Sequence, residues 1–218
     1  MKKVIKLTLI VALGFMCSSL ACEDDHTAPV ISIIGTNPVI IHIGDGYTDE
    51  GATAWDDEDG DVTKYLSASS NVDINTAGSY FILYSVVDAP GNVSEKKRTV
   101  IIENSVEYLK GIYNVSNTFN GGTPVNFTDS ITPSPISNDR VFVSRFANYV
   151  NAEVFFDLNP SVHTLQLSSQ SISCGTPSTL RTFAGSGSYT VNPVIFTINY
   201  TETTGGNTVS GLITYTQQ

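Results

Sequence analysis

The chain has 218 residues, a formal net charge of −10 and a hydrophobic fraction of 41%. Acidic residues concentrate in the first half, where residues 22–104 hold fifteen Asp and Glu against four Lys and Arg; residues 105–218 hold six against four. Neither half carries a basic patch, which argues against nucleic acid and against electrostatic attachment to anionic lipid.

The chain opens with the pattern of an exported protein. Three lysines precede an apolar run over residues 7–16, and small residues follow at 18–21. The apolar run is about half as long as the roughly 20 residues that a transmembrane helix needs. The pattern therefore predicts a signal peptide over residues 1–21.

The box Ser19-Leu20-Ala21-Cys22 resembles the lipobox of bacterial lipoproteins. This resemblance implies cleavage before Cys22 and acylation of its thiol, with residues 22–28 as a tether. The acidic run at 23–25 is similar to the signal that sends lipoproteins of the Bacteroidota to the outer face of the outer membrane. A solvated spacer is the alternative for that run, and a secretory signal cleaved near Ala21 is the alternative for the box.

Short β-branched runs begin after the tether. They lie at residues 30–34, 39–43, 79–87 and 98–102 and are separated by Gly, Pro, Asn and Asp. No stretch keeps apolar residues at helical spacing, so the pattern predicts strands and almost no helix. We expect a β-sandwich domain over residues 29–104.

The second half continues with similar runs but different turns. Strand candidates lie at 112–119, 140–146, 152–156, 165–167, 194–201 and 211–215. Many short strands at this spacing predict an antiparallel sandwich or barrel over residues 107–218. Residues 185–189, GSGSY, are expected to form a hairpin. Cys174 is the only cysteine after Cys22, so no intramolecular disulfide is expected if Cys22 carries lipid.

Two sequence segments carry a family resemblance. YTDEGATAWDDEDGDVT at residues 47–63 and TAGSYFILYSVVDAPGN at 76–92 follow one another, and together they resemble the bacterial surface immunoglobulin (Ig)-like domain family, also described from a pesticidal crystal protein. The match covers residues 28–103 and implies a small Ig-like sandwich that serves as a spacer or attachment module. The C-terminal half is more loosely similar to β domains of unknown function in Bacteroides-type lipoproteins. A lipocalin-like barrel is the competing interpretation.

A run of acids between residues 56 and 61 suggests a calcium site. Hard oxygen ligands on a turn suit Ca²⁺, and acids from neighbouring loops would complete the shell. The proposed ligands are Asp49, Asp56, Asp57, Asp59, Asp61 and Asp88. The alternative is that these residues only form solvated turns and cap backbone amides.

Other candidates for a site are few. Trp55, the only tryptophan, is expected to fill the sandwich core, with stacking on a sugar ring as the alternative. His26, His42 and His163 lie in no recognisable catalytic or zinc motif, and no spacing pairs His163 with Cys174. We therefore expect no catalytic residues.

The sequence thus predicts an all-β, noncatalytic, lipid-anchored protein of the outer membrane, exposed at the cell surface. An Ig-like stalk would present a β binding domain, for example for glycan capture in a polysaccharide-uptake system. The expected partners are the membrane, through the lipid, and polysaccharide or other surface proteins. The alternatives are a small-ligand carrier, which needs an apolar pocket in the second domain, and a surface glycan-active enzyme, which needs convergent acids in a cleft.

Overall fold

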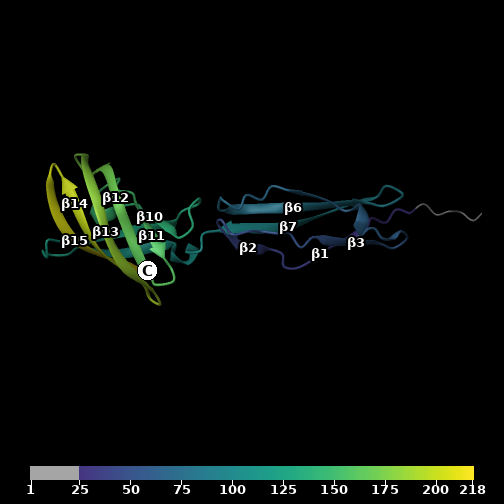
Figure 1. The fold of residues 1–218 in the computed structure, drawn as a ribbon, viewed down its shortest axis with the longest axis horizontal. Coiled ribbons are helices and arrows are strands. Elements are labelled where there is room, and N and C mark those ends of the chain that lie inside the picture. The colour runs from purple at the N-terminus through teal and green to yellow at the C-terminus, as the bar shows by residue number, and fades with distance from the viewer. Residues whose placement is uncertain (1–24) are drawn as a thin grey trace, which may run out of the picture.

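The computed structural model describes residues 25–218, and Cys22 and the leader lie outside this range. The described residues form fifteen strands and three short 3₁₀ turns, which confirms the all-β prediction. Figure 1 shows an elongated molecule: one group of strands lies next to residue 25, and a second group lies at the opposite end. The first group is called the sandwich (residues 30–103) and the second the barrel (residues 111–217).

The sandwich consists of two sheets. One sheet has the order β1 (Val30–Ile33), β3 (Ala52–Asp56), β4 (Gly60–Asp61). The other has the order β2 (Val39–His42), β7 (Val93–Glu103), β6 (Gly78–Val87), β5 (Ser67–Ser70). β2 pairs with β7 in parallel, and every other pair in the sandwich is antiparallel. A 3₁₀ turn, η1 (Thr63–Tyr65), joins β4 to β5.

Strand alternation builds the core of the sandwich. In β6, Ile82, Tyr84 and Val86 are buried, whereas the residues between them are less buried or exposed. Nine hydrophobic residues make up the buried cluster, and Tyr84 is its only aromatic member. The core is therefore small for an independent unit.

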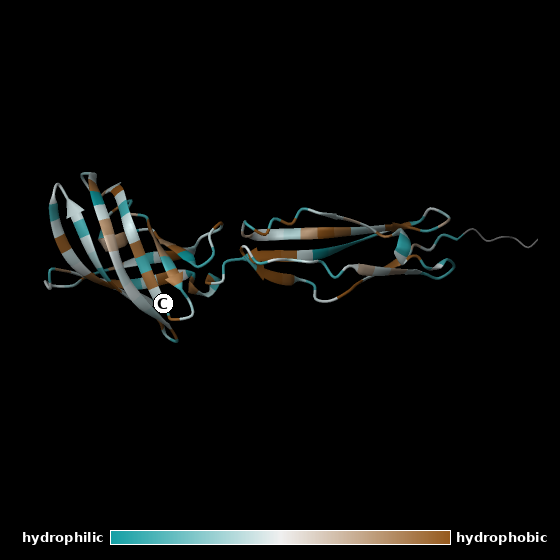
Figure 2. Cartoon of the chain, viewed as in Figure 1, coloured by the Kyte–Doolittle hydropathy of each residue, from teal (hydrophilic) through white to brown (hydrophobic). Residues whose placement is uncertain are grey.

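The barrel is a closed, antiparallel meander. Each strand pairs with the next one in the chain, and β15 pairs with β8 to close the ring. Its strands are β8 (Gly111–Phe119), β9 (Val125–Pro133), β10 (Arg140–Val143), β11 (Val154–Asn159), β12 (Thr164–Cys174), β13 (Thr179–Val191), β14 (Val194–Thr204) and β15 (Asn207–Gln217). Two further 3₁₀ turns are η2 (Glu107–Leu109) and η3 (Phe146–Asn148). Hydrophobic and hydrophilic residues alternate along these strands in Figure 2, as expected when one face points inward.

The sequence predicts a hairpin at the GSGSY segment, residues 185–189. In the structure this segment lies within strand β13 instead. The turn comes later, at Asn192 and Pro193, between β13 and β14. A Cβ on Gly185 would lie 2.3 Å from the carbonyl oxygen of Asn199, and one on Gly187 would lie 2.1 Å from that of Thr197. The two glycines therefore allow β13 and β14 to approach closely, which is a use of glycine at strongly bent positions in barrels.

The segment between the sandwich and the barrel is held by hydrogen bonds. The Asn104 side chain is buried and donates to the carbonyl oxygens of Ser134, Ser137 and Arg140 in the β9–β10 region. Its Oδ1 accepts from the backbone amides of Val106 and Asp139. A further hydrogen bond crosses directly from the amide of residue 77 to the carbonyl oxygen of residue 135, at 2.7 Å. The joint is therefore a bonded contact and not a loose linker.

Candidate functional site

The acidic turn lies at the end of the sandwich far from the barrel (Figure 1). It connects β3 to β4, and strand alternation separates its acids. Asp56 points into the protein and is 1% exposed, whereas Asp57, Asp59 and Asp61 are exposed. The five acids between residues 56 and 61 therefore do not converge on one point.

Asp56 instead meets two acids from other segments. One carboxylate oxygen each from Asp25, Asp56 and Asp88 lies within 4.8 Å of the other two. Asp25 comes from the segment before the first strand and Asp88 from the loop after β6. Asp56 and Asp88 are buried, and Asp25 is half-buried. Asp88 was among the predicted ligands, whereas Asp25 was not.

Most oxygens of this cluster have hydrogen-bond donors. Asp56 Oδ1 accepts from the amides of Glu58 (3.0 Å) and Asp59 (2.9 Å). Asp88 Oδ1 accepts from the amides of Gly91 and Asn92, and its Oδ2 accepts from the Asn92 side chain. Burial opposes the ionisation of Asp88, but these bonds outweigh it and lower its pKa. Asp88 is therefore held as an anion at neutral pH.

Two oxygens of the cluster have no donor. Asp25 Oδ2 and Asp56 Oδ2 are buried and unpartnered, and none of the ion pairs among the described residues involves Asp25, Asp56 or Asp88. The negative charge of Asp25 is also the main cause of a raised pKa at the neighbouring, exposed Glu58. Buried carboxylate oxygens without a donor or a cation are unfavourable in a protein. No lysine, arginine or histidine among the described residues forms an ion pair with this cluster.

Three of the other predicted ligands, Asp49, Asp59 and Asp61, are engaged with protein groups. Asp49 lies 2.8 Å from Arg98 Nε and accepts a hydrogen bond from Tyr84, so it neutralises a buried arginine of the sandwich core. Asp59 Oδ2 accepts from the Ala89 amide at 2.7 Å and ties the two loops together. Asp61 accepts from the Thr63 amide. The pKa of Asp61 is lowered mainly by hydrogen bonding with the Thr63 side chain and next by this amide. Asp57 is exposed and accepts no hydrogen bond from another described residue.

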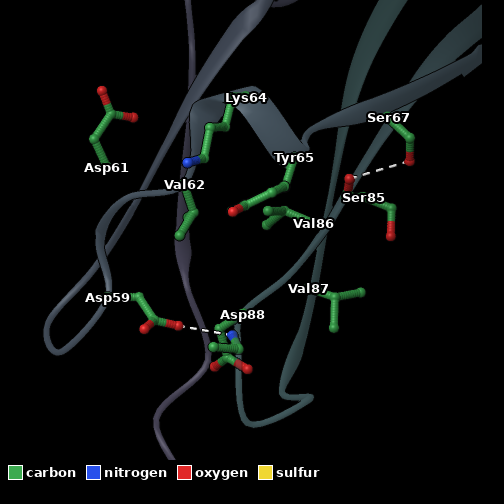
Figure 3. A pocket seen from close by; sticks show the side chains of 11 residues that line it. Asp59, Asp61, Val62, Lys64, Tyr65, Ser67, Ser85, Val86, Val87 and Asp88 are labelled. Atoms are coloured by element: carbon green, nitrogen blue, oxygen red, sulfur yellow. Dashed lines mark hydrogen bonds between the residues drawn. The ribbon is translucent and has the colours of Figure 1, made fainter.

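An open pocket of about 460 Å³ lies beside the acidic turn. Figure 3 shows Tyr65 and Val86 on its wall. The dashed line near Asp88 is the hydrogen bond from the Ala89 amide to Asp59. Lys64 and Asp61 also line it. The pocket is more polar than the enclosed apolar sites that bind small ligands.

Trp55 does not fill the core, contrary to the sequence prediction. Its side chain is 62% exposed, and the residue opposite on β1, Val30, is also exposed. The reason is the alternation of β3: Ala54 and Asp56 point inward, so Trp55 must point outward. An exposed aromatic ring with a polar N–H is suited to contacts with partly polar ligands.

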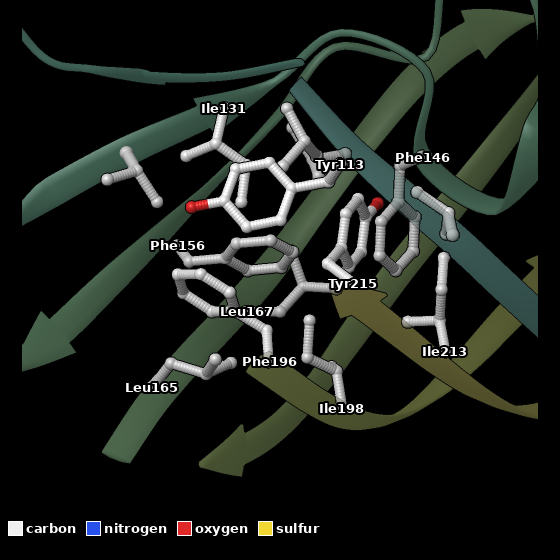
Figure 4. Packing of buried hydrophobic residues seen from close by; sticks show 14 of the residues in the cluster. Tyr113, Ile131, Phe146, Phe156, Leu165, Leu167, Phe196, Ile198, Ile213 and Tyr215 are labelled. Carbon is white, nitrogen blue, oxygen red and sulfur yellow. The ribbon is translucent and has the colours of Figure 1, made fainter. Parts of the chain in front are cut away.

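The interior of the barrel is filled by its own side chains. In Figure 4 the rings of Tyr113, Phe156, Phe196 and Tyr215 lie against one another inside the strands. Tyr113 makes edge contacts with Phe196 at 5.9 Å and with Tyr215 at 6.3 Å between ring centroids. A carrier would need these rings to line a cavity rather than fill it.

The described histidines and Cys174 do not meet. His163 packs edge-on against Tyr189, with ring centroids 5.2 Å apart. Cys174 is buried near Arg181 and Glu202, and burial raises the pKa of its thiol. A buried, protonated thiol is a poor nucleophile. Arg181 forms an ion pair with Glu202, and its guanidinium lies over the Tyr149 ring.

Comparison with known proteins identifies the sandwich. Residues 31–102 match the family model described as "Bacterial surface protein, Ig-like domain". This segment is a bacterial surface Ig-like domain. The match agrees with the family resemblance of the sequence, and the structure adds a closed barrel in the second half. The match thus covers the Ig-like domain, and the barrel lies outside it.

Two solved structures are weakly similar to most of the chain. The lipoprotein BT2262 from Bacteroides thetaiotaomicron is 16% identical with a TM-score of 0.35, over 87% of this chain and 100% of that one. A structure of CBM51-2 in complex with GlcNAc and INT domains from Clostridium perfringens ZmpB is 16% identical with a TM-score of 0.29, over 86% of this chain and 43% of that one. No curated protein matches. These likenesses are too weak to indicate a function.

The predicted lipidation site, Cys22, lies outside the described residues. Within residues 25–218, no helix has the length and apolar character needed to cross a membrane.

Proposed function

We propose that this protein is a noncatalytic, lipid-anchored surface protein in which the Ig-like domain holds the barrel away from the outer membrane. The observation that carries the proposal is the order of parts along the molecule. The segment that follows Cys22 enters the Ig-like domain at one end, and the barrel lies at the other end (Figure 1). A lipid on Cys22 would therefore place the barrel far from the membrane surface.

The joint supports a display role. Four hydrogen bonds of the Asn104 side chain connect the end of the Ig-like domain to the barrel. A fixed joint keeps the barrel at a defined distance and orientation, whereas a flexible linker would let it fold back on the membrane. Anchoring also raises the local concentration of a binding face, so a weak affinity suffices.

We also propose glycan capture by the Ig-like domain, with Trp55 as the stacking platform. Trp55 lies in β3 beside the acidic turn, so this role is separate from the display of the barrel. Trp55 is the only tryptophan of the chain, and its ring is largely exposed. The filled barrel interior gives no support to the carrier alternative. The separated histidines and the buried Cys174 give none to an enzyme.

The anchor is tested by metabolic labelling with an alkyne fatty acid in a host of the Bacteroidota. The wild-type chain should take up label and stay on whole cells, where added protease digests it. Cys22→Ala should be unlabelled and should not be retained on the cell surface. Cys17→Ala, which changes a leader cysteine, should behave as wild type. An unlabelled wild-type chain, or label that persists in Cys22→Ala, would contradict the anchor.

Glycan capture is tested on an array of bacterial and plant polysaccharides. The wild type should bind a subset, and Trp55→Ala should lose that binding. Tyr65→Ala, which removes another exposed ring, is the matched control and should retain it. If the wild type binds no polysaccharide, the glycan part is wrong and the display part stands on the labelling result.

A further inference from the structure

The cluster of Asp25, Asp56 and Asp88 has the spacing of a small cation site. Each carboxylate contributes one oxygen, and these oxygens lie within 4.8 Å of one another. Calcium takes six to eight oxygen ligands in a flexible geometry, whereas magnesium usually binds through one or two carboxylates and keeps several of its waters. Three carboxylates from three separate segments therefore favour calcium.

A second feature points to a ligand independently of the acids being close. Asp56 is 1% exposed, and its Oδ2 has no donor although Oδ1 has two. Asp25 Oδ2 is also buried without a donor. Backbone capping uses one oxygen of Asp25 and one of Asp56, and it leaves the second oxygen of each available to a ligand. A cation would satisfy both orphan oxygens and balance the three charges.

The three acids come from segments that are distant in the sequence. Asp25 precedes the first strand, Asp56 ends β3, and Asp88 follows β6. The Asn92 side chain already links two of these segments, because it donates to the carbonyl oxygens of Asp25 and Thr27 and to Asp88 Oδ2. Ligation would therefore fasten the segment next to the predicted lipid anchor onto the end of the Ig-like domain.

We propose that Asp25, Asp56 and Asp88 bind one Ca²⁺ ion, which clamps the chain before β1 to the loops after β3 and β6. The ligand set differs from the sequence prediction in gaining Asp25 and in leaving out Asp49, Asp57, Asp59 and Asp61. The site goes beyond the proposed function, since it does not require that the protein bind glycan or carry lipid. Its consequence is a stalk that is rigid from its first residues only when calcium is present.

The test uses the full chain, freed of metal with a chelator, and Tb³⁺ as the first probe. Trp55 is the only tryptophan and precedes Asp56 in β3, so excitation of Trp55 should sensitise Tb³⁺ luminescence, and Ca²⁺ should quench it by displacement. Calorimetric titration should then give one Ca²⁺ per chain. Its affinity should lie near the 10⁻⁴–10⁻³ M range of extracellular modules, with Mg²⁺ weaker by about tenfold or more.

Asp25→Asn separates the site from a general charge effect. The asparagine keeps an oxygen that can accept the Thr27 amide hydrogen bond, which is 2.7 Å long to Asp25 Oδ1. It replaces Asp25 Oδ2, which has no donor, with an uncharged amide nitrogen. It lies outside the strands, so the fold should survive. Ca²⁺ affinity should fall by about tenfold or more, because charge count sets affinity in such sites. Asp57→Asn removes the same charge from an exposed neighbour and should change affinity by less than about threefold.

Two results would overturn the site. One is the absence of Ca²⁺-dependent heat and of a calcium-induced rise in Tm up to about 10 mM, above the weak end of extracellular sites. The other is equal loss of affinity in Asp25→Asn and Asp57→Asn, which would indicate nonspecific attraction to the acidic end. Neither result would bear on the labelling or array experiments, so the two proposals fail separately.

Discussion

The Ig-like domain and the barrel are both β structures, yet they are stabilised by different interactions. The buried cluster of the Ig-like domain has nine hydrophobic residues with one aromatic ring, whereas that of the barrel has twenty-four with eight rings. The Ig-like domain adds a buried arginine, Arg98, which is 1% exposed and paired with Asp49. The barrel adds phenol groups that are buried among its apolar side chains.

This difference shows how a small sandwich compensates for a small core. Arg98 donates to the carbonyl oxygens of Ile34, Thr36 and Gly51, so one side chain pairs three backbone groups between the sheets. Such polar contacts depend on charge and geometry, whereas the barrel depends mainly on apolar area and adds one ion pair, Arg181–Glu202, to it. The two regions should therefore respond differently to pH and to substitution.

Alkaline pH should have the largest effect and should act mainly on the barrel. Burial raises the pKa of five barrel tyrosines, and that of Tyr149 reaches about 12. In the Ig-like domain burial raises the pKa of two tyrosines, Tyr47 and Tyr84. The unfolded chain releases these protons near pH 10, where the folded chain keeps them, so stability falls as pH rises above about 10. The barrel should lose more free energy of unfolding than the Ig-like domain.

The measurement is urea unfolding at about pH 9 and pH 11, on either side of the unfolded tyrosine pKa. Methyl NMR signals of Val100 and Val141, both fully buried, report the Ig-like domain and the barrel separately. An equal loss in both regions, or a larger loss at Val100, would contradict the comparison.

Arg98→Ala should have the next largest effect and should act on the Ig-like domain. The substitution leaves Asp49 with only hydroxyl partners and removes the donor from three carbonyl oxygens. Removal of one partner of a buried ion pair costs about 3–5 kcal/mol. The Val100 signal should show this loss in urea, and the Val141 signal should be unchanged.

Lys97→Ala is the matched control for Arg98. Lys97 lies next to it on β7 but is exposed, with its amine 4.7 Å from the centre of the Phe81 ring. The expected loss is about 0.5–1 kcal/mol. If Arg98→Ala costs no more than Lys97→Ala, the buried arginine does not stabilise the sandwich as the structure suggests.

The fold class could be predicted from sequence because strand alternation and turn residues are local signals. Two barrel strands were nevertheless missed. β9 (Val125–Pro133) is rich in polar residues, and β13 contains Gly185 and Gly187, which usually mark turns. Both strands are set by pairing with neighbours in a closed ring, and a local pattern does not contain that information.

The site was harder to predict because its residues meet only in the fold. The acidic turn is visible in the sequence, but the alternation of β3 decides that Asp56 points inward and Trp55 outward, and no local pattern indicates which face is the core. The sequence predicts an export signal or spacer at Asp25, because nothing in it places Asp25 beside Asp88. The pairing of Asp49 with Arg98 likewise depends on how the two sheets pack.

Asn104→Ala should have a smaller effect on stability than Arg98→Ala, and it tests whether the two regions are held together. It leaves the carbonyl oxygens of Ser134 and Ser137 and the amides of Val106 and Asp139 without this partner. The expected cost is about 1–3 kcal/mol. Residual dipolar couplings measure orientation directly: the wild type should fit one alignment tensor, and Asn104→Ala should need two. Asn104→Asp keeps the acceptor for both amides and should lie between them. If the wild type itself needs two tensors, the two regions move independently. The Ig-like domain and the barrel would then behave as two separate proteins joined by a chain, with no fixed stalk.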